Sequence, residues 1–125
     1  MTFDFLDRVA ASRPRPRPIF KAFRTRLVMN EDARQAFFPS TDKVLLAYDP
    51  DTSHLAVKAL APDVQEHAGW QAFHIERQPR SSDSYHVDWR PFWDREVGRM
   101  GGRPVVRGEE AIQRYGEDVI AMSLA

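Results

Sequence analysis

The side chains best suited to metal binding or acid–base chemistry in this sequence are its histidines, and they are scattered. The four histidines are His54, His67, His74 and His86. No two of them stand four residues apart, the spacing that puts two histidine ligands on one face of a helix. His86 and Asp88 share one face of a strand-like segment and supply two ligands, but no third is evident. We therefore predict that the chain has no metal site.

A nucleophilic site is also poorly supported. The segment Ser81-Ser82-Asp83-Ser84 could combine with His74 or His86, but the Gly-x-Ser-x-Gly turn that exposes a catalytic serine is absent. A serine-rich loop is more often a simple turn. The chain has no cysteine, which excludes disulfides, thiolate catalysis and cysteine-based zinc sites.

Acidic and glycine pairs have local structural explanations. The pairs Asp49/Asp51 and Glu109/Glu110 carry the carboxylates needed for acid–base work, but turn and helix-start chemistry explains both. The glycines of Gly101-Gly102-Arg103 lack the Lys-Ser/Thr that completes a phosphate-binding loop, and they resemble a helix stop. We predict a binding module rather than an enzyme, with no cofactor.

Charge is the most informative pattern, because a net charge of zero hides an asymmetry. The stretch from Arg8 to Asn30 contains seven basic residues and no acidic one. The remainder, from Glu31 onward, contains 11 basic and 16 acidic residues, a net charge of −5. A basic segment on an acidic body suits an anionic partner such as a phosphate backbone. Pairing of this segment with the body, or with a sister subunit, is the alternative.

The N-terminal part of this basic stretch alternates arginine with proline. Proline excludes helix from Arg13 to Pro18 and favours an extended polyproline II arm. Such an arm can lie along phosphates or enter a minor groove. It can equally be a solvated leader, or a proline-rich segment that a protein partner binds.

The remaining sequence predicts an α+β fold of mostly short antiparallel strands with two short helices. We expect strands at residues 20–29, 44–48, 55–60, 70–77, 85–87, 105–106 and 119–124. Asn30 is a good N-cap for a helix that runs to about Phe38, and Asp88 can cap a second helix over residues 91–100. A helical turn is expected over residues 109–115. The hairpin between the strands at 44–48 and 55–60 turns at Asp49-Pro50-Asp51.

This element order suggests how the chain is divided. Residues 1–18 are expected to form an N-terminal segment with the Arg-Pro arm, and residues 19–125 one compact domain. Residues 19–60 and 70–125 share the order strand, capped helix, strand, turn, strand, which suggests two tandem β-α-β-β units. No apolar run approaches the roughly 18 residues of a membrane span, and no targeting segment is visible, so we expect a small soluble cytoplasmic protein.

One aromatic cluster has two interpretations. Trp89, Phe92 and Trp93 lie among Arg90 and Arg95, and aromatic side chains interleaved with arginine can stack on bases. The aromatic positions also form one apolar stripe on a helix, which is typical of a core face. We favour the core.

Part of the first half resembles a known family. The residues that carry this resemblance are Arg26-Leu27-Val28-Met29-Asn30-Glu31-Asp32-Ala33-Arg34-Gln35-Ala36-Phe37, Lys43-Val44-Leu45-Leu46-Ala47-Tyr48-Asp49 and Leu55-Ala56-Val57-Lys58. They look like the AbrB/SpoVT swapped-hairpin DNA-binding unit, whose members are dimeric transition-state regulators and antitoxins. The resemblance implies DNA contacts by Arg26 and Arg34. Asn30 stands where the family has proline, Gln35 where it has a second helix arginine, and Phe37-Phe38 where it has Leu-Gly.

These patterns together predict a small regulatory or accessory protein that binds nucleic acid mainly through its phosphates. The residues expected to bind are Arg13, Arg15, Arg17, Lys21, Arg24, Arg26 and Arg34. The alternative is a protein-interaction module, such as an antitoxin, an inhibitor or a phage-type adaptor. Both readings are compatible with a homodimer.

Overall fold

The computed structural model describes residues 17–61, 71–79, 84–98 and 103–125. Strands form most of it, as the sequence predicts. The strands are β1 (Ile19–Ala22), β2 (Arg26–Asn30), β3 (Lys43–Asp49), β4 (His54–Ala59), β5 (Phe73–Arg77), β6 (Ser84–Asp88), β7 (Val105–Gly108), β8 (Gln113–Tyr115) and β9 (Val119–Ser123). The helical segments are α2 (Glu31–Phe37), α3 (Arg90–Phe92), the π-helical η1 (Trp93–Val97) that continues α3, and the 3₁₀ turn η2 (Glu109–Ala111).

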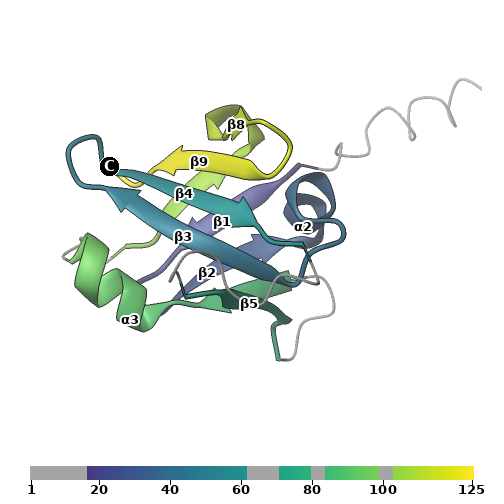
Figure 1. Cartoon of the computed structure of the whole chain (residues 1–125), viewed down its shortest axis with the longest axis horizontal. Coiled ribbons are helices and arrows are strands. Elements are labelled where there is room, and N and C mark those ends of the chain that lie inside the picture. The colour runs from purple at the N-terminus through teal and green to yellow at the C-terminus, as the bar shows by residue number, and fades with distance from the viewer. Residues whose placement is uncertain (1–16, 62–70, 80–83, 99–102) are drawn as a thin grey trace, which may run out of the picture.

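All nine strands belong to one antiparallel sheet that curls into a half-barrel (Figure 1). Their order is β7-β1-β2-β6-β5-β3-β4-β9-β8. The edge strand β7 is tied to the end of β9 by Arg107, whose guanidinium donates to the carbonyls of Ser123 at 2.8 Å and Ala125 at 2.6 Å. The α+β class with antiparallel strands and two short helices is therefore confirmed.

The strand expected over residues 20–29 is instead a hairpin, and this prediction was wrong. β1 ends at Ala22, and the Phe23 amide donates to the Arg26 carbonyl at 2.9 Å across the turn. The break is held from outside the segment, because the Trp89 indole donates to the Phe23 carbonyl at 2.7 Å. A partner 66 residues away leaves no local signal in the sequence.

The first helix begins as the sequence predicts. The side chain of Asn30 accepts a hydrogen bond from the Ala33 amide at 2.9 Å, the geometry of an N-cap. Glu31 and Asp32 lie in the first turn, where the helix dipole favours acidic side chains.

The second helix differs from the prediction at both ends. Its N-cap position is Trp89 and not Asp88, and no side chain caps it. After one turn it widens into a π-helix that closes at Gly98, where φ is +78°. The Trp93 indole donates to the Gly98 carbonyl at 2.9 Å, so the wide turn is fixed by the same tryptophan that begins it.

The core lies inside the curl and extends to both helices, which sit at opposite ends of the half-barrel (Figure 1). At one end, Phe20 packs against Phe37 and Phe38, with ring centroids 5.7 and 6.4 Å away. At the other end the aromatic cluster is almost fully buried, with Trp89 and Trp93 at 0% exposure and Phe92 at 2%. The expectation that this cluster belongs to the core is confirmed.

Candidate nucleic-acid interface

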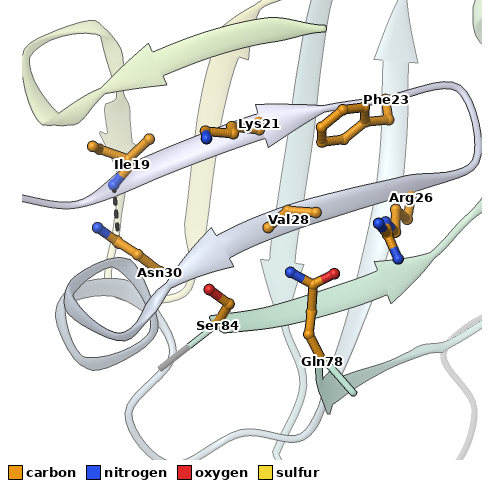
Figure 2. Close-up of a pocket in the computed structure, with 8 residues that line it drawn as sticks. All are labelled: Ile19, Lys21, Phe23, Arg26, Val28, Asn30, Gln78 and Ser84. Atoms are coloured by element: carbon orange, nitrogen blue, oxygen red, sulfur yellow. Dashed lines mark hydrogen bonds between the residues drawn. The ribbon is translucent and has the colours of Figure 1, made fainter. Parts of the chain in front are cut away.

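The outer face of the sheet carries a shallow groove of about 290 Å³ over β1, β2 and the adjoining end of β6 (Figure 2). The residues that line it are Ile19, Lys21, Phe23, Arg26, Val28, Asn30, Gln78 and Ser84. Successive side chains of a strand point to opposite faces. Phe20, Ala22, Leu27 and Met29 therefore enter the core, and their neighbours line the groove.

Two of the predicted binding residues meet in this groove. Lys21 and Arg26 are exposed and come from the two neighbouring strands of one hairpin (Figure 2). Within the part of the chain that the structure describes, neither forms an ion pair. Their charges are therefore available to an anion outside the protein.

Charge on this face changes sign between β2 and β6. Residues paired across neighbouring strands point to the same face. Arg26 is opposite Asp88, and Val28 is opposite His86, which is in turn opposite Glu76. Lys21 and Arg26 thus make the β1–β2 side basic, and Asp88 and Glu76 make the β6–β5 side acidic. An anion is attracted to the first side and repelled from the second.

Arg17 lies where the Arg-Pro arm joins the sheet, and Asn30 fixes that junction. The Asn30 amide nitrogen donates to the Arg17 carbonyl at 2.8 Å. Its oxygen accepts from the Ile19 amide at 3.1 Å while also capping α2 (Figure 2). The Arg17 side chain remains exposed. One asparagine therefore anchors both the helix and the start of the arm, whose Arg13 and Arg15 lie outside the described residues.

Arg24 is positioned by an acidic partner. It lies in the turn between β1 and β2, where its Nε is 3.1 Å from Asp94 Oδ1 of η1. The Arg24 side chain is still 66% exposed. The ion pair orients the Arg24 guanidinium toward η1, so this group is less available to a ligand outside the protein.

Arg34 is used within the fold. Its guanidinium donates to the Phe38 carbonyl at 2.8 Å and to Asp42 at 2.9 Å, and it also bonds to the Thr41 carbonyl. The same group lies 5.3 Å from the centre of the Tyr85 ring, and its side chain is only 13% exposed. These contacts close the loop after α2, so the structure does not bring Arg34 together with Lys21 and Arg26.

The groove contains residues that the sequence analysis did not predict to bind nucleic acid, among them Phe23, Val28, Gln78 and Ser84. The side chains of Phe23 and Val28 point to the outer face of the sheet, as those of Lys21 and Arg26 do. Recognition of the hairpin turn at residues 23–25 would have identified these two. Gln78 and Ser84 are brought to the rim by the pairing of β6 with β2, which has no local signal.

Metal chemistry gains no support from the described residues. Within them no group of three or more potential ligands comes together. Of the two candidate ligands His86 and Asp88, His86 has the Glu76 carboxylate 3.9 Å from its Nε2. No helix in the described ranges is long and apolar enough to cross a membrane.

In comparisons with known proteins, no family model, no curated protein and no solved structure matches this chain.

Proposed function

We propose that this protein binds nucleic acid through the phosphates, using the basic strip formed by Arg17, Lys21 and Arg26. The observation that carries the proposal is the groove of β1 and β2, in which Lys21 and Arg26 are exposed and form no ion pair within the described residues. Arg13 and Arg15, which precede Arg17 in the sequence and lie outside the described residues, are proposed as further phosphate contacts. Lysine and arginine side chains of this kind supply the sequence-independent part of nucleic-acid affinity.

Arg24 and Arg34 have positioning roles in this proposal. Arg24 holds the β1–β2 turn to Asp94, and Arg34 closes the loop after α2. They keep the hairpin and its helix in place and contribute less to phosphate contact than Lys21 and Arg26 do.

We also propose that the domain consists of two tandem β-α-β-β units, which would let one chain imitate an AbrB-like dimer. The pairing of β2 with β6 supports this. The register of these two strands is symmetric about the pair Val28 and His86. A two-fold axis through that pair places Arg26 on Ser84 and Asn30 on Asp88. The neighbouring strands follow the same symmetry, with β1 and then β7 on one side and β5 and then β3 on the other.

A protein partner is the second candidate, and one feature favours it. A second groove lies along the edge strand β7, where Val106 is 49% exposed beside Ile19 and Glu110. Glu109 and Glu110 line this groove together with Arg17, and an apolar edge next to two carboxylates suits a basic peptide that adds to the sheet.

Fluorescence anisotropy with labelled oligonucleotides, from low to physiological salt, tests the first proposal. Replacement of Lys21 or Arg26 by alanine should weaken binding and lower the slope of log K against log salt by about one each. Removal of residues 1–16 should lower it further. Lys58→Ala is the matched control, because Lys58 lies on the same outer side of the sheet in β4, well away from the groove in the strand order.

Loss of affinity only in the strip variants supports the proposal. Equal loss in Lys58→Ala would mean a diffuse charge effect, and absence of binding at low salt would refute the proposal and favour the protein partner.

A further inference from the structure

The groove that holds the basic strip also has an apolar floor. Ile19, Phe23 and Val28 are half-buried on the outer face, where Val28 is paired with Lys21 across the hairpin and Phe23 lies beside Arg26 (Figure 2). A site for phosphate alone needs only the cations, and it gains nothing from an aromatic ring and two aliphatic side chains. The combination suits a ligand that carries both negative charge and a flat apolar ring.

Polar groups at the rim complete this pattern. The side chains of Gln78 and Ser84 line the groove, and within the described residues neither makes a side-chain hydrogen bond. An amide both donates and accepts, and a hydroxyl does the same, so they can pair with the edge of a base. The Asn30 amide lines the groove too, but the arm junction and α2 occupy it.

The platform is held rigid before any ligand arrives. The Phe23 carbonyl accepts from the Trp89 indole at 2.7 Å, and the Phe23 amide is bonded across the turn to Arg26. A preorganised surface loses little conformational freedom on binding, which favours affinity.

We propose that this groove binds a base of single-stranded nucleic acid, with Phe23 as the stacking surface and Lys21 and Arg26 on the flanking phosphates. The inference rests on the proposed function and names the class of its ligand. The volume of about 290 Å³ is at the lower end for small-molecule sites, which corresponds to about one nucleotide.

The width of the sheet argues against insertion of this face into the major groove of a duplex. The groove lies in the middle of five adjacent strands, β7-β1-β2-β6-β5. With neighbours about 4.8 Å apart, these strands span roughly 19 Å, whereas the major groove of B-DNA is about 12 Å wide. A single strand can lie across such a surface, because its bases are free to turn toward the protein.

Anisotropy titrations with three ligands test this inference: a single-stranded oligothymidylate of about twelve nucleotides, an abasic strand of the same length, and a duplex. The abasic strand keeps the phosphates and removes the bases. We expect it to bind about fivefold to 100-fold more weakly than the thymidylate strand, and we expect Phe23→Ala to remove that difference.

A second variant guards against misfolding of Phe23→Ala. Gln78→Ala changes only a rim side chain, and we expect it to weaken thymidylate binding about twofold to tenfold while abasic binding stays unchanged. Circular dichroism and thermal melting establish that each variant is folded.

The outcomes separate the two proposals. Equal binding of the thymidylate and abasic strands, or tighter binding of the duplex, would overturn the base site and leave phosphate binding standing. No binding of any of the three at low salt would overturn both.

Discussion

The two halves of the sheet meet at β2 and β6 and start their helices by different means. In the first half, Asn30 caps α2 with its own side chain, and the cap is readable in the sequence. In the second half, Trp89 begins α3 without a side-chain cap and is fixed by packing and by its bond to Phe23. The difference shows that one helix start is specified locally, and the other depends on the completed fold.

The halves also differ in charge. The outward side chains of β1 and β2 include Lys21 and Arg26, whereas those of β5 and β6 include Glu76 and Asp88. The strand pair β1–β2 and the strand pair β5–β6 thus present opposite charges on one continuous face. Any anionic ligand of this face must approach the first half.

The largest effect is expected where the first helix meets the sheet. Phe20→Ala should destabilise the fold by about 3–5 kcal/mol, because Phe20 is fully buried and its removal leaves a cavity against Phe37 and Phe38. Urea unfolding measures the change. The exposed residue Val106 of β7 serves as control, and Val106→Ala should change stability by no more than about 0.5 kcal/mol.

A small effect of Phe20→Ala would mean that α2 does not depend on the sheet, against the contacts described above.

Arg34 tests whether a charge in the first half is structural or external. Arg34→Lys keeps the charge but loses the forked contacts to Phe38, Thr41 and Asp42, so stability should fall by about 1.5–3 kcal/mol. Affinity for oligonucleotides should stay within about twofold, because the Arg34 side chain is mostly buried and its guanidinium is bonded within the fold. The pattern opposite to this, unchanged stability with weakened binding, would restore Arg34 to the interface.

The two helix starts can be compared directly. Asn30→Ala should cost about 0.5–2 kcal/mol, because it removes a cap and the anchor of the arm. Asp88→Ala, at the symmetric position of β6, should cost no more than about 0.5 kcal/mol, since Asp88 is exposed and does not cap α3. Thermal unfolding of the two variants measures this difference in stability.

Asn30→Asp refines the comparison, because it retains the accepting oxygen and replaces the donor to the Arg17 carbonyl with a carboxylate oxygen. Its cost should fall between those of Asn30→Ala and the wild type. Equal costs for Asn30→Ala and Asp88→Ala would remove the distinction between the halves.

The smallest effect concerns Glu31 in the first turn of α2. The hydrogen bond from Gln35, followed by that of Tyr85, holds the pKa of the Glu31 carboxyl below its ordinary value. A pKa that is lower in the folded than in the unfolded chain contributes stability above the unfolded value. That contribution is lost as the pH falls through the folded value.

Gln35→Ala should therefore raise the Glu31 pKa, which a carboxyl NMR titration measures directly. The control is Gln71→Ala, which changes an exposed glutamine outside the helix and should leave the Glu31 pKa where it is. A Glu31 pKa that does not move in Gln35→Ala would identify another cause of the shift.

The candidate site was predictable only in part. Lys21 and Arg26 were identified from charge, and the structure brings them into one groove with Phe23 and Val28. Arg34 was selected from the resemblance to the AbrB/SpoVT unit, but its contacts with Phe38 and Asp42 occupy it. The sequence reveals that a residue is charged, but it does not reveal which charged side chains form hydrogen bonds and ion pairs within the fold.

The sequence by itself determined the features whose causes are local. The cap of α2 at Asn30, the hairpin of β3 and β4, and the buried stripe of Trp89 and Trp93 follow from neighbouring residues. Only the tertiary structure decided the break between β1 and β2, the π-helical turn at Trp93 and the division of charge between β2 and β6. The physical reason is distance along the chain. A local hydrogen bond or side-chain period leaves its pattern within a few residues, whereas Trp89 binds Phe23 and Arg26 faces Asp88 only after the sheet has assembled.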